Sequence, residues 1–468
     1  MRKKKCLILI CLFLLIFSSS FVVNQSISSV GTTGQSLKRF NTHNYTFIWE
    51  EYLNAPGNQQ GDDSLVFGPS FASYHNYTEL VAKLQSLNVN FPEIIELFSI
   101  GKTYFGKEIY GVRITDELVD DSSKSEVLIV AQHHAREQIT VENALYFIDK
   151  MVNDSLDPSS GISALLSQKA IFVIPSLNID GAELMSKYPW QRKTARPVDE
   201  DGDGTDDEFE ASDINGDGYI ERLYRNFGDY SNPDWRIVGH EGIDLDGDGT
   251  IGEDAPGGVD PNRNYPIQFG NQSGASSDPR AEDYHGSAPF SENCTARLRD
   301  FVLERNFVTA LSLHSGIFMI IPPWGWSNKY PEGKGGEVHN TTGQQFEALT
   351  GIPYDHLYPC SGDWGDWLYG RENTPTKIAF TIETYMDENA LDGEFNSTTQ
   401  IYHERGIWDM FNPPADQVMD NCRRLYPGLL YLIEFDYPSS VSGFELWIFI
   451  PVIAAVAAFT VFRRKKEN

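Results

Sequence analysis

Four short apolar segments stand out along the chain, and each is flanked by charged or glycine-containing sequence. Such runs, without alternation of apolar and polar positions, are typical of strands buried on both faces of a sheet. After the first run, apolar residues recur at helical spacing between residues 141 and 152. The pattern predicts an α/β protein with a mostly parallel central sheet. The four predicted strands are residues 126–132 (EVLIVAQ), 170–178 (AIFVIPSLN), 307–313 (FVTALSL) and 377–383 (KIAFTIE).

Both ends of the chain have the pattern of targeting segments. A basic cluster and a short apolar core begin residues 1–26, which is typical of a secretory signal peptide. Residues 446–462 carry no charge and are followed at once by RRKK. As a helix this segment would be about 25 Å long, so it predicts a single membrane span with residues 463–468 in the cytoplasm. A buried core helix or a removed C-terminal signal is the alternative.

These end segments leave an exported part of the chain. Residues 27–70, with the polar stretch NAPGNQQGDD, are predicted to be a flexible lead, and residues 437–445 a tether to the membrane. Two of the five cysteines fall in the signal peptide. The simplest expectation for the three remaining cysteines is one disulfide and one free thiol, and the sequence favours no particular pair. The remaining cysteines are Cys294, Cys360 and Cys422.

The formal net charge of −29 argues against nucleic acid as a partner and against binding to an anionic membrane surface. Much of this charge lies in residues 198–258, where aspartates alternate with other residues and glycine follows. This pattern predicts Ca²⁺ loops that stabilise an insertion, and a solvated acidic loop is the alternative. The first copy, with Asp199, Asp201, Asp203 and Glu210, matches the twelve-residue pattern in full; Asp213, Asn215 and Asp217, and then Asp244, Asp246 and Asp248, match only its first half.

Three of the four predicted strands end in residues that can bind a metal or move a proton. His134 and Glu137 follow the first strand, and His314 follows the third. In parallel sheets ligands bind beyond the carboxyl ends of the strands, so these residues would meet there. Two histidines and a glutamate form a zinc site that leaves a position open for water. Glu383, at the end of the fourth strand, would be a further carboxylate nearby.

The order of these residues resembles that of the carboxypeptidase A-type zinc metallocarboxypeptidases. The resemblance covers about residues 71–436 and includes six elements in the same order. It implies a single catalytic domain, a mixed, mostly parallel sheet with helices on both faces, and one catalytic Zn²⁺. The elements are His134 with Glu137, the segment WQRKT at 190–194, DPNRNYP at 260–266, His314 with Ser315, Tyr358 followed by SGDWGDWLYG, and Glu383.

The resemblance also implies a role for each residue. Glu383 would be the general base toward zinc-bound water, and zinc with Arg192 would stabilise the oxyanion. Arg196 is the fallback, because an insertion after Trp190 leaves the register open. Asn262 and Arg263 would bind the free α-carboxylate of the substrate, and Tyr358 would close over its last residue.

The pocket for the last side chain is less clearly defined. By the same resemblance its floor falls on Gly365, which is small and uncharged, and Asp363 lies close by. A neutral floor suits large apolar residues, whereas an inward-facing aspartate attracts lysine or arginine. We therefore expect a broad preference covering both.

The sequence thus predicts a membrane-anchored, extracellular zinc metallocarboxypeptidase that hydrolyses the C-terminal peptide bond of peptides or proteins. Residues 27–70 are too few for the globular pro-domain of pancreatic relatives. Two alternatives remain: a zinc hydrolase acting on cell-wall or other non-protein conjugates, and a calcium-dependent surface binding protein on an inactive peptidase scaffold. The first would use the same machinery, and the second conflicts with the complete set of ligands and base.

Overall fold

The computed structural model describes residues 74–197, 204, 210–227, 235–243, 256–271, 273–327 and 329–437. Contacts divide the chain into residues 1–52 and 53–468, and every described residue belongs to the second unit. The predicted signal peptide, flexible lead and membrane span lie outside the described residues. Within the described ranges, no helix is long and apolar enough to cross a membrane.

The central sheet has seven strands in the order β1-β2-β4-β3-β9-β11-β10. The four middle strands pair in parallel, and the three outer ones join antiparallel. The middle strands are the four predicted from apolar runs, so the mostly parallel core is confirmed. The strands are β1 (Ile95–Lys102), β2 (Glu108–Ile114), β3 (Ser125–Ala131), β4 (Lys169–Ile174), β9 (Phe307–His314), β10 (Ile317–Ile321) and β11 (Ile378–Tyr385).

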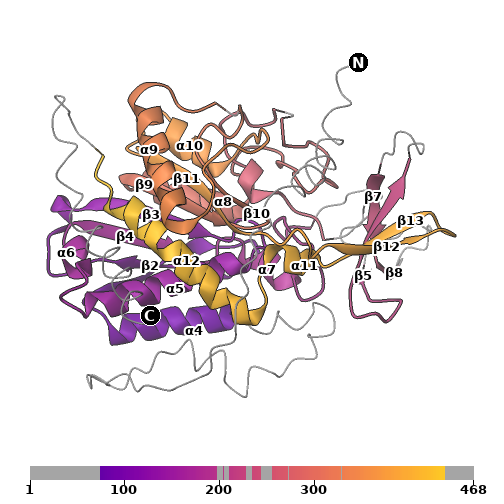
Figure 1. Cartoon of the computed structure of the whole chain (residues 1–468), viewed down its shortest axis with the longest axis horizontal. Coiled ribbons are helices and arrows are strands. Elements are labelled where there is room, and N and C mark those ends of the chain that lie inside the picture. Colours follow the sequence, from indigo (N-terminus) through magenta and orange to yellow (C-terminus); the bar gives the residue numbers. More distant parts are fainter. Residues whose placement is uncertain are drawn as a thin grey trace, which may run out of the picture. The chain divides into compact units, whose positions relative to one another are not determined.

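Helices cover both faces of this sheet (Figure 1). On one face, Leu128 of β3 and Phe172 of β4 pack in a buried cluster with residues of α8 (Asn293–Leu303) and α10 (Trp364–Gly370). Alternate residues of β3 point to the opposite face. There α5 (Ile139–Ser155) packs on β3 and β4, α12 (Ala415–Glu434) packs on α5, and α9 (Gly333–Thr350) packs on α12. The other helices are α4 (Tyr77–Asn90), α6 (Ile162–Leu166), α7 (Ile179–Leu184), α11 (Ile407–Phe411) and the 3-10 turns η2 (Asp121–Ser123) and η3 (Pro261–Arg263).

β4 ends four residues before the predicted end. Pro175 follows Ile174 and has no N–H to donate to a neighbouring strand, which stops the ladder. The chain then turns, and the backbone amides of Leu177 and Asn178 donate to Ala131 and Gln132 beside the end of β3. This turn brings the segment after β4 alongside the residues that follow β3.

A second sheet has four strands in the order β12-β13-β6-β7. Its strands come from two distant segments, because β6 (Arg222–Asn226) and β7 (Trp235–His240) lie in the acidic region, whereas β12 (Asp392–Asn396) and β13 (Ile401–Arg405) follow β11. A short pair, β5 (Glu210–Ala211) with β8 (Gly242–Ile243), lies in the acidic region as well. The sequence pattern did not predict this small sheet. Figure 1 shows it beside α7 and α11, which share a buried apolar cluster with Ile220 and Trp190.

The predicted disulfide is wrong, because Cys294, Cys360 and Cys422 are all free thiols. Cys294 is buried in α8 and Cys422 in α12, on opposite faces of the central sheet. A disulfide requires Cα atoms within about 7 Å, which a sheet between the two helices does not allow. Cys360 lies in a loop and contacts Arg263 through its sulfur.

Candidate active site

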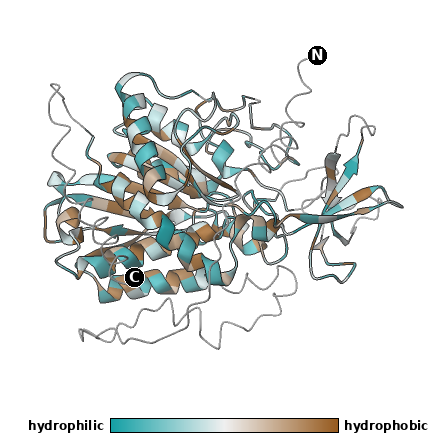
Figure 2. Cartoon of the chain, viewed as in Figure 1, coloured by the Kyte–Doolittle hydropathy of each residue, from teal (hydrophilic) through white to brown (hydrophobic). Residues whose placement is uncertain are grey.

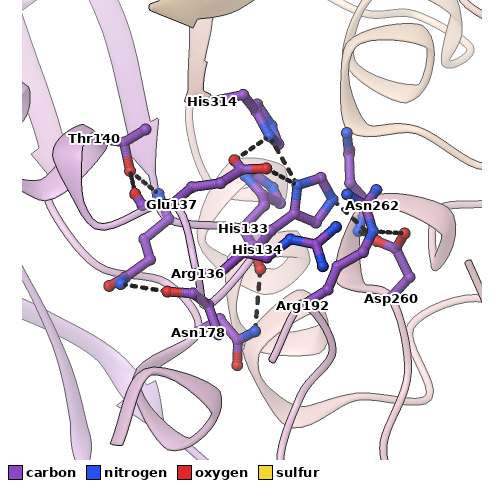
Figure 3. A network of polar contacts seen from close by, with 12 residues as sticks. His133, His134, Arg136, Glu137, Thr140, Asn178, Arg192, Asp260, Asn262 and His314 are labelled. Carbon is purple, nitrogen blue, oxygen red and sulfur yellow. Dashed lines mark hydrogen bonds and ion pairs between the residues drawn. The ribbon is translucent and has the colours of Figure 1, made fainter. Parts of the chain in front are cut away.

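The carboxyl ends of β3 and β9 bring His134, Glu137 and His314 together (Figure 3). Their ligand atoms all lie within 4.8 Å of one another, and the three side chains are buried. The Nδ1 atoms of the two histidines are 3.2 Å apart. Oε1 of Glu137 is 2.6 Å from Nδ1 of His134, and Oε2 is 2.9 Å from Nδ1 of His314. The fold therefore brings His314 to His134 and Glu137, and the three residues direct their donor atoms at one point.

The opposite nitrogen of each histidine has its own partner. Nε2 of His134 is 3.2 Å from Oδ1 of Asp260, and Nε2 of His314 is 2.9 Å from the hydroxyl of Ser312. A carboxylate accepts the Nε2 proton of His134, which leaves the Nδ1 lone pair directed at the cluster. His133 stands behind this pair, with its ring 5.4 Å from that of His314. It therefore supports the cluster without being part of it.

The charges of the cluster suit a divalent cation. Burial alone would raise the pKa of Glu137, but His134 and His314 hold it well below its ordinary value. Burial lowers the pKa of His314 and so favours its neutral, metal-binding form. One ionised carboxylate with two imidazoles is the donor set of a catalytic zinc site, so the residues present fit Zn²⁺.

Glu383 lies on β11, directly opposite His314 in the parallel register. Its side chain is buried, and Oε2 has no hydrogen-bond partner among the described residues. Burial, with the nearby charge of Glu137, raises the pKa of Glu383 well above its ordinary value. A carboxyl group with a raised pKa beside the metal position is suited to take and return a proton.

Arg192 lines the same cleft, and its Nε donates to Oδ2 of Asp260 over 2.9 Å. Asp260 therefore holds both a metal-ligand histidine and this arginine. The fallback residue, Arg196, lies apart from the cleft lining and forms an ion pair with Glu292 at 3.7 Å. The structure thus places Arg192, and not Arg196, beside the metal cluster.

The turn η3 carries Asn262 and Arg263 into the cleft. Oδ1 of Asn262 accepts the backbone amide of Trp364 at 3.0 Å, which ties this turn to the start of α10. Nη1 of Arg263 donates to the backbone oxygen of Asn262 at 2.9 Å. Tyr358 also lines the cleft and is 57% exposed, so its ring is accessible from solvent.

The cleft has a volume of about 330 Å³, and its lining includes Gly365, Asp363 and Asp366. Asp363 caps α10, and its Oδ2 is buried without a partner among the residues described. Asp366 accepts the backbone amides of Gly325 and Trp326. Burial raises the pKa of both carboxyl groups. The predicted Gly365 and Asp363 therefore lie together, beside a second acid, Asp366, that was not predicted.

Most of the predicted calcium ligands lie outside the described residues, including the aspartates of the first and third copies. In the second copy, Asp213 accepts the backbone amides of Gly216 and Gly218, and Asn215 accepts that of Asp217. Among the described residues, the zinc cluster is the one group of metal-binding side chains that meets. The part of this region that the structure describes therefore shows a tight turn at Asp213 and no assembled calcium site.

Two residues that organise the site were not predicted. Asp260 begins the motif DPNRNYP, and its place directly before Asn262 and Arg263 was the available signal. Ser312 lies two residues before His314, where the alternation of β9 puts both side chains on one face. No sequence pattern marks a serine at this position as a histidine partner.

Fold and site together define an α/β protein with a two-histidine, one-glutamate metal centre at the carboxyl edge of its sheet. A family model described as zinc carboxypeptidase matches residues 80–428, and the chain belongs to this family. Carboxypeptidase A4 from Mus musculus is 26% identical over 326 residues, which are 67% of this chain and 63% of that protein. Carboxypeptidase A2 from Rattus norvegicus is 25% identical over 381 residues, 79% of this chain and 72% of that one.

Solved structures show the same fold. The crystal structure of carboxypeptidase A from Helicoverpa armigera aligns with 82% of this chain and 78% of that chain, with a TM-score of 0.57 and 20% identity. A structure of thrombin activatable fibrinolysis inhibitor aligns with 82% of this chain at a TM-score of 0.56. The predicted family resemblance and fold class are therefore confirmed.

Proposed function

We propose that the protein is a zinc-dependent metallocarboxypeptidase that hydrolyses the C-terminal peptide bond of peptides or proteins. The observation that carries this proposal is a single cleft whose lining includes His134 and Glu137 of the metal cluster together with Glu383 and Arg263. A metal centre alone would suit many hydrolases. A guanidinium and an amide on the same wall add recognition of a free carboxylate, which an exopeptidase needs.

Zinc held by His134, Glu137 and His314 would act as a Lewis acid toward the scissile carbonyl and lower the pKa of water. Glu383 accepts a proton from the attacking water and delivers it to the departing amine nitrogen as the C–N bond breaks. Arg192, oriented by Asp260, donates to the carbonyl oxygen as negative charge develops there. The products are the shortened peptide and one free amino acid.

The far end of the cleft supports a preference that includes basic residues. Gly365 leaves space at the pocket floor, and a side-chain carbon there would come within 3.3 Å of Oδ1 of Asp363. A lysine or arginine side chain entering this space would give the unpartnered Oδ2 of Asp363 a cationic partner. An apolar side chain would bring no counter-charge, and burial, which raises the pKa of both carboxyl groups, favours their neutral forms there. We propose that both kinds of residue are accepted.

We also propose that Ca²⁺ stabilises the acidic region and that the chain is exported and anchored in a membrane. The calcium proposal is supported by the turn at Asp213 and by Glu241, whose Oε2 is buried without a partner among the described residues. Oε1 of Glu241 accepts the backbone amides of Ile214 and Asn215 in the same turn. Export and anchoring are supported by the sequence of residues 1–26 and 446–462.

The proposed activity is tested with the zinc-loaded full chain and peptides that differ only in the last residue. Each peptide is paired with a C-terminally amidated copy, and the products are weighed by mass spectrometry. We expect loss of single residues from the free-acid peptides only, with lysine, arginine and large apolar residues all removed. Cleavage of the amidated copies, or bound zinc without any cleavage, would contradict the proposal.

A further inference from the structure

One face of the small sheet carries a row of large side chains. Phe395, Tyr402, Tyr224 and Ile237 are directly paired across its four strands. Trp235 lies two residues before Ile237 on β7, and its ring lies 5.9 Å from that of Phe395 and 6.2 Å from that of Tyr402. We call these five residues the aromatic face. Trp235, Ile237 and Phe395 are 38%, 44% and 46% exposed, which is high for side chains of this size.

The aromatic face continues toward the active site. Arg222 lies two residues before Tyr224 on β6, so both side chains point to the same side. The guanidinium of Arg222 is 5.5 Å from the centre of the Tyr224 ring. His240, which pairs with Arg222 across the strands, stacks on Trp190 at 3.7 Å. This side of the sheet is therefore the one turned toward the segment that bears Arg192.

A chain of ion pairs completes the connection. Nη1 of Arg222 donates to Oε1 of Glu282 at 2.9 Å. Glu282 also accepts two hydrogen bonds from Arg136, at 3.1 and 3.0 Å. Arg136 lines the cleft, stands between His134 and Glu137 in the sequence, and places its guanidinium 4.3 Å from the ring of Phe411. Direct contacts therefore lead from Arg136, on the lining of the cleft, to the aromatic face.

The reach of this path fits a peptide. The path from Arg136 to the aromatic face consists of two ion pairs of about 3 Å each, the side chains that form them, and two strand positions of about 3.3 Å each. The aromatic face therefore lies roughly 15 Å from Arg136. An extended polypeptide covers about 3.3 Å per residue, so about five residues span this distance. Aromatic side chains with a polar edge are enriched where peptides bind.

We propose that the aromatic face is a secondary binding surface for an apolar segment of the substrate polypeptide, located about five or more residues before its C-terminus. The inference rests on the proposed carboxypeptidase activity, which fixes one end of the substrate in the cleft. Once that end is held, the upstream segment is at high effective concentration near the aromatic face. The surface would select long substrates over short ones without any change in the chemistry.

The test uses the zinc-loaded full chain and two free-acid peptides of about ten residues, a length that exceeds the estimated reach. Both peptides share their last four residues; one continues with phenylalanine and leucine and the other with glycine and serine. We expect a KM for the apolar peptide that is about tenfold lower, with equal kcat. Trp235→Ala and Phe395→Ala should each remove most of this difference and leave turnover of a blocked dipeptide unchanged.

Phe105→Ala is the matched control, since Phe105 is a 56% exposed phenylalanine on the turn between β1 and β2. It should leave the preference intact, and Phe395→Tyr should restore it. Equal KM values for the two peptides in an active wild-type enzyme would overturn this inference and leave the proposed function standing. No turnover of any peptide, the dipeptide included, would instead refute the proposed function. A change from dimer to monomer in the alanine variants by sedimentation, with peptide preference unaltered, would reassign the aromatic face to self-association and overturn the inference.

Discussion

The two sheets of this protein reach stability by different means. Strand β3 of the central sheet is almost entirely buried, and its neighbours β4 and β9 pair with it in parallel. In the small sheet, β13 is only partly buried along its whole length. Ion pairs such as Arg405 with Glu221 and Arg222 with Glu404 hold it in place. Apolar burial makes a rigid platform for the metal cluster, whereas partial exposure leaves side chains available for a ligand.

Figure 2 shows the same contrast in hydropathy. The strands of the central sheet are mostly apolar, and the helices that cover them carry both apolar and polar residues. The strands of the small sheet mix apolar and polar residues along their length. Changes in the central sheet should therefore affect chemistry and folding, and comparable changes in the small sheet should affect neither.

The largest effect is expected from the base on the central sheet. Glu383→Gln removes the proton acceptor and keeps the side-chain volume, so kcat should fall by about a hundred- to ten-thousand-fold while bound zinc remains. His314→Ala is the companion variant and should lose both zinc and turnover, because it removes a metal ligand. Metal analysis and peptide turnover measure the two properties separately. Undiminished turnover in zinc-loaded Glu383→Gln would refute the assigned mechanism.

A matched pair of phenylalanines compares the two sheets directly. Phe172 on β4 is 1% exposed, whereas Phe395 on β12 is 46% exposed. Phe172→Ala should reduce the free energy of unfolding by about 3–5 kcal/mol, because it opens a cavity in the core. Phe395→Ala should change it by less than about 0.5 kcal/mol. Urea unfolding of both variants gives the comparison, and equal losses would show that the small sheet is a core of its own.

A buried histidine makes the central fold sensitive to acid. In α9, Nδ1 of His339 donates to Gly335 O at 2.8 Å, while Nε2 accepts the amide of Ala379 on β11 at 3.2 Å. Burial lowers the pKa of His339 to about 4. The unfolded imidazole has a pKa of about 6.5, so the unfolded chain binds the proton first as the pH falls.

Stability from His339 should therefore be complete above about pH 6.5 and be lost between about pH 6.5 and 4, by up to roughly 3 kcal/mol. Thermal unfolding across this range measures the loss. His339→Gln cannot titrate and should show a shallower dependence on pH. An identical slope in the wild type and the variant would contradict this origin of acid sensitivity.

The smallest effect concerns calcium in the acidic region. If Ca²⁺ binds there, a hundredfold excess over its Kd should raise the free energy of unfolding by about 2.7 kcal/mol. Asp213→Asn should weaken the gain, whereas Asp300→Asn, an exposed change on α8, should not. Melting temperatures with calcium, with magnesium and with neither separate a specific site from general charge screening. No shift with calcium would favour a solvated acidic loop.

Sequence patterns were informative where burial is nearly complete. The runs around Leu128, Phe172 and Leu311 predicted the middle strands, because a strand covered on both faces must be apolar at successive positions. The small sheet gave no such signal. Its strands contain the charged residues Arg222, Glu404 and Arg405 as well as aromatic ones, and its two hairpins are far apart in the sequence.

The sequence by itself determined the metal donors, since His134, Glu137 and His314 stand at the ends of predicted strands in a recognisable order. Only the tertiary structure decided how they are supported. Asp260 reaches both His134 and Arg192, and Asp366 joins Asp363 at the end of the cleft. Tertiary structure also separated the three cysteines. These relations depend on which strands become neighbours, and pairing between distant segments is set by the packing of the whole core and not by local pattern.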